Sequence, residues 1–108
     1  MKKGYWVVRA KLIDTEEYSK YISLATEIIK KYGGQFIVRG GHQKEFENFG
    51  FDRTVVVEFE SYDDAVKCYK SSDYQSALDH VKDSAVRYVS IVEAVSYTHL
   101  TLPTNLCV

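Results

Sequence analysis

Apolar and polar residues alternate at the start of the chain, and the period then changes. Between positions 5 and 12 every even residue is apolar, while the odd residues are mixed. A period of two residues predicts a β-strand with one face on the core. From about 15 to 32 apolar residues recur at helical spacing, after a capping-box pattern formed by Asp14 and Glu17. Gly33 predicts the end of this helix, because glycine tolerates the left-handed cap.

Three more strands and a helical segment in two pieces follow. The strands are expected at 35–39, 54–60 and 86–93, and the helical pieces begin after Ser61 and near Ser71 or Ser72. Residues 41–53 have no clear period and are expected to form a long hairpin connection. The order strand, helix, strand, strand, helix, strand predicts an α+β fold. This order of elements is typical of a ferredoxin-like βαββαβ sandwich, with helices on one face of a four-stranded antiparallel sheet.

The other face of the sheet is expected to stay uncovered. If no strand contains a bulge, this open face carries Tyr5, Arg9, Arg39 and Glu93 beside six apolar side chains, which are Val7, Ile37, Val55, Val57, Val89 and Ile91. Such a surface is too apolar to be left in water. A second copy stacked sheet to sheet would bury it, so the pattern predicts a homodimer that closes a dimeric α/β barrel.

Length and charge narrow the classes of protein. A chain of 108 residues fits one domain, and 14 basic against 15 acidic residues leave a net charge of −1. No overall field therefore attracts nucleic acid or an anionic membrane, and we expect neither as a partner. The first apolar run is too short for a signal peptide or a spanning helix, which predicts a cytoplasmic protein. Cys68 and Cys107 match no disulfide framework or zinc spacing.

The segment KYGGQFIVRGG holds the strongest candidate for chemistry. Arg39 ends the predicted strand, where a half-buried strand usually carries an aliphatic or neutral residue. Its planar guanidinium suits a carboxylate or an enolate oxygen, and Gly40 and Gly41 would let a ligand approach closely. The alternative is a structural ion pair of Arg39 with Glu58 or Glu93, within the chain or across a dimer.

Two more residues are expected on the face of Arg39, and one follows the glycine pair. Tyr5 and Arg9 would line a pocket with Arg39, whereas His42 is the candidate general base. A solvated loop histidine is the alternative interpretation of His42. The carboxylates near His42 match no metal-ligand motif, so we expect no metal site. The predicted ligand-binding residues are Arg39, Gly40, Gly41, Tyr5 and Arg9.

Four segments together carry a resemblance to a known family. They are YW at 5–6, YGGQFIVRGG at 32–41, RTVVVEFES at 53–61 and the pattern A-x-x-x-Y-x-S-x-x-Y-Q at 65–75. With these segments the chain resembles the bacterial family known as domain of unknown function 1330, in the dimeric α/β-barrel superfamily. The family usually has FPS where this chain has FES at 59–61, and a turn with glycine and proline at 47–52.

The resemblance implies a dimeric barrel but no reaction. Its superfamily includes cofactor-independent monooxygenases, haem-degrading enzymes, muconolactone isomerase-like proteins and ligand-binding domains. We expect a small anionic or phenolic ligand and no cofactor. One alternative is a cofactor-independent enzyme, monooxygenase- or isomerase-like, in which Arg39 holds an oxyanion and His42 or a tyrosine moves a proton. The other is a structural dimer without a ligand. A pocket of several hundred cubic ångströms between sheet and helices would favour a ligand.

The end of the chain differs in character from the rest. The sequence VSYTHLTLPT, from position 95, resembles a translated sequencing adapter of the transposase type. We therefore expect a domain at 1–94 and a non-native tail at 95–108.

Overall fold

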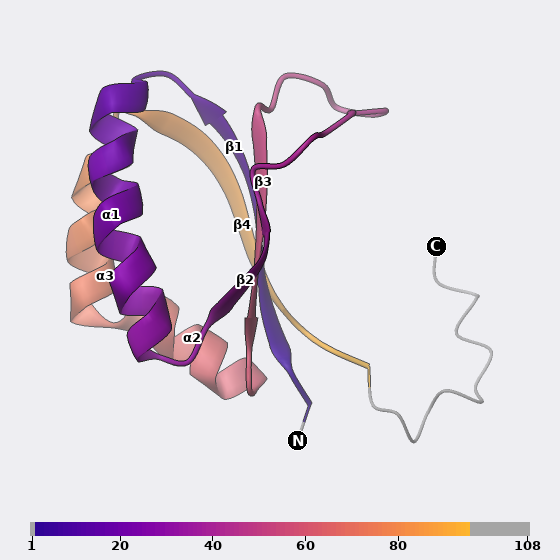
Figure 1. Cartoon of the computed structure of the whole chain (residues 1–108), viewed down its shortest axis with the longest axis vertical. Coiled ribbons are helices and arrows are strands. Elements are labelled where there is room, and N and C mark those ends of the chain that lie inside the picture. The colour runs from indigo at the N-terminus through magenta and orange to yellow at the C-terminus, as the bar shows by residue number, and fades with distance from the viewer. Residues whose placement is uncertain (1, 96–108) are drawn as a thin grey trace.

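All the described helices lie on one face of a four-stranded antiparallel sheet (Figure 1). The structure, a computed structural model, describes residues 2–95. The strands are β1 (Gly4–Leu12), β2 (Gln35–Arg39), β3 (Arg53–Phe59) and β4 (Ala85–Glu93), in the spatial order β2-β3-β1-β4. The helices are α1 (Thr15–Lys31), α2 (Tyr62–Lys70) and α3 (Ser72–Ala77), which continues into the short 3-10 helix η1 (Leu78–His80). The predicted ferredoxin-like α+β fold is confirmed.

Local signals in the sequence set the helix ends. Asp14 accepts a hydrogen bond from the Glu17 amide at 3.1 Å, as the capping pattern predicts. Ser61 caps α2 in the same way through the Asp64 amide at 3.1 Å. Beyond α1, Gly33 has a φ of 84°, a conformation that glycine adopts without strain. These contacts depend on residues close in sequence, which is why the helix ends are predictable.

The core lies between the helices and the inner face of the sheet, around Trp6. The indole Nε1 donates to the Ala65 carbonyl at 2.9 Å and ties β1 to α2. The rings of Phe59, Tyr69 and Tyr74 surround the indole at centroid distances of 4.9–5.8 Å. Aromatic packing of this kind buries a large apolar area and holds the helix layer on the sheet.

The pairing of β1 with its neighbours corrects the predicted faces of β3 and β4. Trp6 and Val8 are buried under the helices, and each pairs with one residue of β3 and one of β4. Directly paired residues of antiparallel strands point to the same side of the sheet, so the four partners also face the helices. These partners are Val55, Val57, Val89 and Ile91. Their predicted place on the open face is wrong, because β3 is apolar at three consecutive positions and carries no alternation there.

The open face still carries apolar side chains, of which Val7 is among those predicted and the others are not. Val86, Tyr88 and Val92 of β4 lie on it, and they are 45–63% exposed. Val7 and Val56, which pair across β1 and β3, lie on the same face. Several exposed apolar side chains on one sheet face are typical of a surface that another molecule covers.

A β-bulge in β2 moves Arg39 to the helix-covered face. Phe36 pairs with Val57 and Arg39 with Val55, and the register shifts between Phe36 and Val38. The extra residue, Ile37, lets Phe36 and Arg39 point to the same side although they are three positions apart. The guanidinium of Arg39 accordingly lies over the Phe36 ring, 4.0 Å from its centroid. The prediction that Arg39 shares the open face with Tyr5 is therefore wrong.

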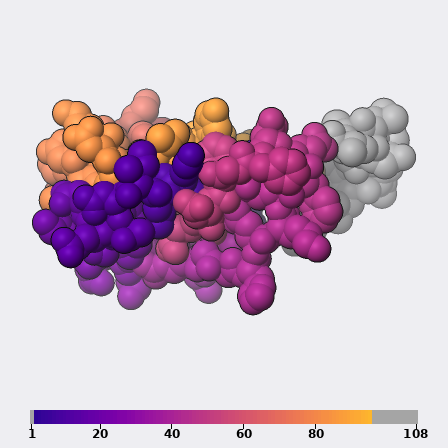
Figure 2. All heavy atoms as spheres, turned by 90° about the horizontal axis from the view of Figure 1, so that it is seen from above, coloured from indigo at the N-terminus to yellow at the C-terminus, as the bar shows by residue number. Residues whose placement is uncertain are grey.

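The connection between β2 and β3, residues 40–52, projects on the side of the open face (Figure 1) and protrudes from the body (Figure 2). One carboxylate makes several of its stabilising contacts. Glu45 accepts from Arg9 Nη2 at 2.7 Å and from the amides of Gly50 and Phe51 at 2.9 and 3.0 Å. Phe46, which follows Glu45, is 80% exposed. The segment is thus a braced loop with an apolar tip.

Two further predictions concern a membrane-spanning helix and the C-terminal tail. No helix within residues 2–95 is long and apolar enough to cross a membrane. The expected tail, 95–108, lies outside the described residues except for Val95.

Candidate functional site

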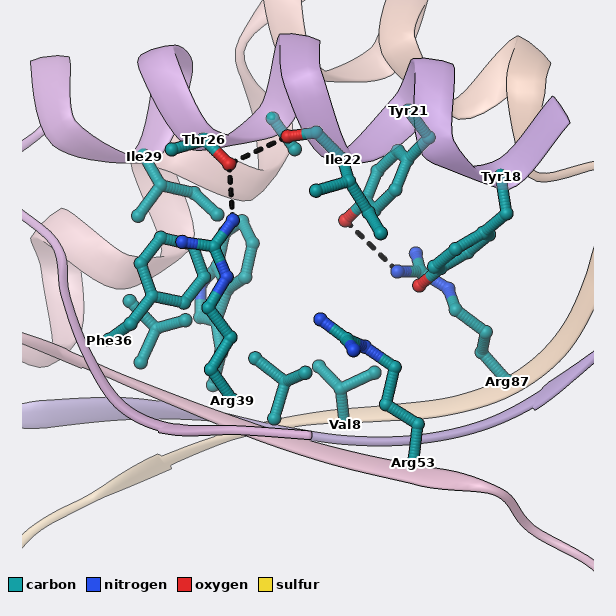
Figure 3. Close-up of a pocket in the computed structure, with 14 residues that line it drawn as sticks. Val8, Tyr18, Tyr21, Ile22, Thr26, Ile29, Phe36, Arg39, Arg53 and Arg87 are labelled. Carbon is teal, nitrogen blue, oxygen red and sulfur yellow. Dashed lines mark hydrogen bonds between the residues drawn. The ribbon is translucent and has the colours of Figure 1, made fainter. Parts of the chain in front are cut away.

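Three arginines face a pocket between α1 and the sheet (Figure 3). Arg39 comes from β2, Arg53 from β3 and Arg87 from β4, and all three side chains rise from the sheet toward the helix. We call this the arginine pocket. Its helix side carries Tyr18 and Tyr21, and much of the remaining wall is apolar, with Trp6, Val8, Ile22, Ala25, Ile29, Val55 and Val57.

The enclosed space is small. Its volume is about 30 Å³, which is room for two or three water molecules. The core is therefore not filled, but the cavity is far smaller than the several hundred cubic ångströms expected for a ligand site. Arg39, an exposed residue, stands at its edge.

Pairing across three strands brings Arg53 and Arg87 to the pocket. Both residues pair with Ala10 of β1, one from each side. Directly paired residues share a face, so the two arginines flank Ala10 under α1. The small side chain of Ala10 leaves the space above the sheet to the two guanidinium groups.

Two of the three arginines have neutral partners. Arg39 Nη2 donates to the Thr26 hydroxyl at 2.5 Å. Arg87 donates to the hydroxyls of Tyr21 and Tyr74 at 3.0 and 3.3 Å. Neither contact brings a negative charge to the guanidinium.

The third arginine, Arg53, has no partner for its buried Nε atom among residues 2–95. The ion pairs in this part of the chain involve other groups, so no carboxylate there compensates Arg39, Arg53 or Arg87. A charged group taken from water without a partner is costly. The arginine pocket therefore presents an excess of positive charge and unused donors.

The phenols at the Arg87 end stay neutral at physiological pH. The hydroxyls of Tyr21 and Tyr74 are 2.6 Å apart, and both rings are buried. Burial raises the pKa of Tyr21 and of Tyr74, more than the neighbouring Arg87 lowers it. Tyr21, which lines the pocket, can therefore exchange hydrogen bonds with a ligand, but neither phenol supplies a base near neutral pH.

Gly40 makes room for Arg53. Its φ is 67°, and a Cβ atom at this position would overlap Arg53 Nη1. A side chain would therefore be strained by the backbone and would displace the guanidinium. Nothing lies within 4 Å of a Cβ added to Gly41, so the two glycines of the pair have different roles.

The structure does not bring Tyr5 and Arg9 to Arg39. Both lie on the open face, where the Tyr5 hydroxyl donates to Glu58 at 2.9 Å and Arg9 pairs with Glu45. The sheet separates them from the arginine pocket. They belong to a second surface, not to the pocket of Arg39.

His42 is exposed and lines a groove of about 410 Å³ on this second surface. Gly41, Arg9 and Thr54 lie along the same groove. The candidate general base is therefore remote from the arginine pocket, although it lies close to Arg39 in sequence.

The predicted intramolecular ion pair of Arg39 is also absent. Glu58 lies 3.8 Å from Lys3 Nζ and accepts from Tyr5, while Glu93 lies 3.8 Å from Lys2 Nζ. Neither carboxylate pairs with Arg39 in the described part of the chain, so this structural alternative is wrong for the single chain.

Sequence reasoning missed Arg53 and Arg87. The available signal was the strand phase. Trp6, Val8 and Ala10 predict an inward face on β1, and a correct alignment of β3 and β4 to them would have placed both arginines inward. That alignment is non-local, and no short motif marks it.

The chain matches one protein family over almost all of the described residues. The sequence model of the family described as "Domain of unknown function (DUF1330)" matches residues 3–95. A comparison with curated proteins finds no match.

Solved structures of similar fold share little sequence with this chain. A protein of unknown function from Rhodopseudomonas palustris aligns with a TM-score of 0.73 and 13% identity, over 88% of this chain and 84% of the other. SnoaB, a cofactor-independent oxygenase from Streptomyces nogalater, aligns with a TM-score of 0.60 and 12% identity, over 95% and 99%. A dimeric ferredoxin-like protein of unknown function from Thermobifida fusca aligns with a TM-score of 0.54 and 13% identity, over 86% and 92%. These likenesses establish the fold alone.

Proposed function

The chain belongs to the DUF1330 family, and we propose that this protein binds a small organic anion in the arginine pocket. One observation supports the proposal. Arg39, Arg53 and Arg87 face one pocket, and no carboxylate among residues 2–95 pairs with them. An anionic ligand would supply the missing acceptors and offset the cost of partly desolvated charges at Arg53 and Arg87.

The walls of the pocket favour an organic anion over a mineral one. A guanidinium binds a carboxylate through two parallel hydrogen bonds. The apolar side chains around the pocket, including Val8 and Ile22, suit a carbon skeleton rather than the hydration shell of an inorganic ion. Phenolic hydroxyls at the Arg87 end would accept from or donate to a second polar group of the ligand.

Binding of small carboxylates to the purified protein tests the proposal. Acetate, propionate, malonate and succinate are added at constant ionic strength, and the melting temperature and calorimetric heat are measured. A ligand present at about 100 times its Kd stabilises the folded state by about 2.7 kcal/mol, which raises the melting temperature by several degrees. Arg39→Met should weaken binding at least tenfold, and Arg39→Lys should weaken it less, because lysine keeps the charge but loses the fork.

Lys30→Met is the matched control for charge. Lys30 lies exposed on α1, outside the arginine pocket, so its loss changes the net charge equally without touching the site. Equal weakening by Lys30→Met and Arg39→Met would mean that the anions respond only to net charge. That result, or no binding of any carboxylate, would refute the proposal.

A second candidate is a cofactor-independent oxygenase that acts on an anionic or phenolic compound. It is supported by the alignment with SnoaB, which covers 95% of this chain and 99% of that protein. In this case Arg39 and Arg53 would hold a developing oxyanion. Oxygen uptake with hydroquinones as probes would support it, provided that Arg53→Met abolishes the uptake. Anion binding without oxygen uptake would leave only the first proposal.

We further propose that a second copy of the chain covers the open face. Val86, Tyr88 and Val92 expose an apolar surface there, and a similar fold from Thermobifida fusca is described as dimeric. The braced 40–52 loop projects on the same side, with Phe46 and Phe49 80% and 71% exposed. In a two-fold dimer, each loop would contact the partner copy beside the stacked sheets.

A further inference from the structure

The geometry points to a compact dianion, a short dicarboxylate of roughly two to four carbon atoms, as the ligand of the arginine pocket. This inference rests on the proposed function and narrows it from any small organic anion to one charge and one size. Three features carry it: the charge of the pocket, the placement of that charge and the enclosed volume.

The charge of the pocket calls for more than one negative charge. A lysine or histidine in such a place would relieve the repulsion by losing its proton, but arginine stays protonated at any physiological pH. Arg39, Arg53 and Arg87 meet only neutral partners among residues 2–95. A monoanion would leave two of the three positive charges uncompensated, whereas a dianion leaves one.

The arginines are spread along the pocket rather than gathered at one point. Figure 3 shows Arg39 beside Thr26 at one end, Arg87 beside Tyr18 at the other, and Arg53 between them. Arg53 and Arg87 stand on strands separated by β1, so their backbones are about 10 Å apart. A ligand with an acidic group at each end would meet both ends of this row, and a single carboxylate would meet only one.

The enclosed volume limits the length of the carbon skeleton. About 30 Å³ holds two or three water molecules, fewer non-hydrogen atoms than any dicarboxylate has, so a ligand must be short and must extend past the exposed Arg39 at the edge of the pocket. The sheet surface between the arginines is apolar, with Val8 and Val55 in its floor, and Ala25 lies on the helix side. Two carboxylates joined by a short chain of carbon atoms match this arrangement of charge and apolar surface.

Calorimetric titration with ligands of matched length tests the inference. Malonate is compared with propionate, and succinate with butyrate, at constant ionic strength and neutral pH. The dicarboxylate of each pair should bind at least tenfold more tightly, a difference of about 1.4 kcal/mol. Arg39→Met removes one end of the charged row and should reduce the preference for malonate to less than threefold. Lys30→Met should leave the preference unchanged.

The outcomes separate the two proposals. If propionate binds as tightly as malonate, the dianion inference is overturned and the anion site stands. If phosphate or sulfate binds more tightly than malonate, the pocket is a mineral oxyanion site and the inference is overturned. If no carboxylate binds, both the inference and the proposed function fail.

Discussion

The two faces of the sheet treat the same type of residue in opposite ways. On the open face Arg9 pairs with the Glu45 carboxylate at 2.7 Å and lies over the Phe51 ring at 4.3 Å. Under the helices Arg53 has a buried Nε atom with no partner among residues 2–95. Arg9 is compensated by a carboxylate, whereas the buried Nε atom of Arg53, whose desolvation is costly, is not. An arginine thus indicates a ligand site when its guanidinium is buried and has no acidic partner. The presence of an arginine alone is not enough.

The largest expected effect comes from adjacent residues that face opposite sides of the sheet. Val57 is 0% exposed in the core, whereas its neighbour Val56 points to the open face. Val57→Asp buries an unpaired charge and should cost more than about 4 kcal/mol, most of the stability of a marginally stable domain. Val56→Asp should leave the fold intact but dissociate the proposed homodimer. Circular dichroism and light scattering measure the two effects.

Leu24→Asp is the control for this comparison. Leu24 is 47% exposed on α1, away from the open face, so a charge there should leave both fold and assembly unchanged. If the unmutated protein is a monomer at micromolar concentration, the proposed dimer fails. If Val56→Asp unfolds the chain as Val57→Asp does, the assignment of the two faces is wrong.

The next effect concerns Arg53 under the helices and Arg9 on the open face. Arg53→Met removes an enclosed charge without a partner, so it should raise the melting temperature while it weakens anion binding at least tenfold. Arg9→Met should lower the melting temperature, because it leaves Glu45 without its ion pair, and should leave anion binding unchanged, because Arg9 does not line the arginine pocket. Thermal unfolding and calorimetry on both variants check this. A fall in melting temperature for Arg53→Met would identify that arginine as a structural strut.

A smaller effect distinguishes strain of the backbone at Gly40 from displacement of the Arg53 side chain. Gly40 and Gly33 have φ values of 67° and 84°, so alanine at either position costs roughly 1–2 kcal/mol of stability. Only at Gly40 does the added Cβ overlap Arg53. Gly40→Ala should therefore weaken malonate binding, and Gly33→Ala should not. Equal affinities of the two variants would mean that Gly40 does not position Arg53 for the ligand.

The smallest effect is the pH dependence of the open-face loop. The hydrogen bond from Arg9 lowers the pKa of Glu45 below its ordinary value of 4.5, with further help from the Phe51 and Gly50 amides. The ionised carboxylate is favoured in the folded state, so its contribution is complete above pH 4.5 and is lost as the pH falls through the lower folded pKa. The amide NMR signals of Gly50 and Phe51 should therefore shift together below that pH.

Two variants in the same loop sharpen the pH experiment. Glu45→Gln should abolish the coupled shift of the two amides, whereas Glu47→Gln, which changes an exposed carboxylate nearby, should preserve it. A coupled shift that survives in Glu45→Gln would assign the transition to another group. The arginine pocket should keep its affinity for malonate in both variants at neutral pH.

Much of this fold could be predicted from the sequence, because its signals are local. The capping contact of Asp14 with Glu17 and the glycine conformation at Gly33 involve residues a few positions apart, so the ends of α1 follow from short patterns. The alternation of β1 likewise predicts its inward face. The same kind of short pattern shows that Arg39 and Gly40 are unusual residues for the end of a strand.

The composition of the site was decided by contacts between distant segments. The bulge at Ile37 turned Arg39 under the helices, and the pairing of Ala10 with both Arg53 and Arg87 brought the other two arginines to it. The elements, their order and the chemically unusual residues follow from the sequence alone. The side of the sheet that each of these residues faces depends on strand pairing, because a shift of one residue in register reverses the face and no local pattern in an apolar strand records it.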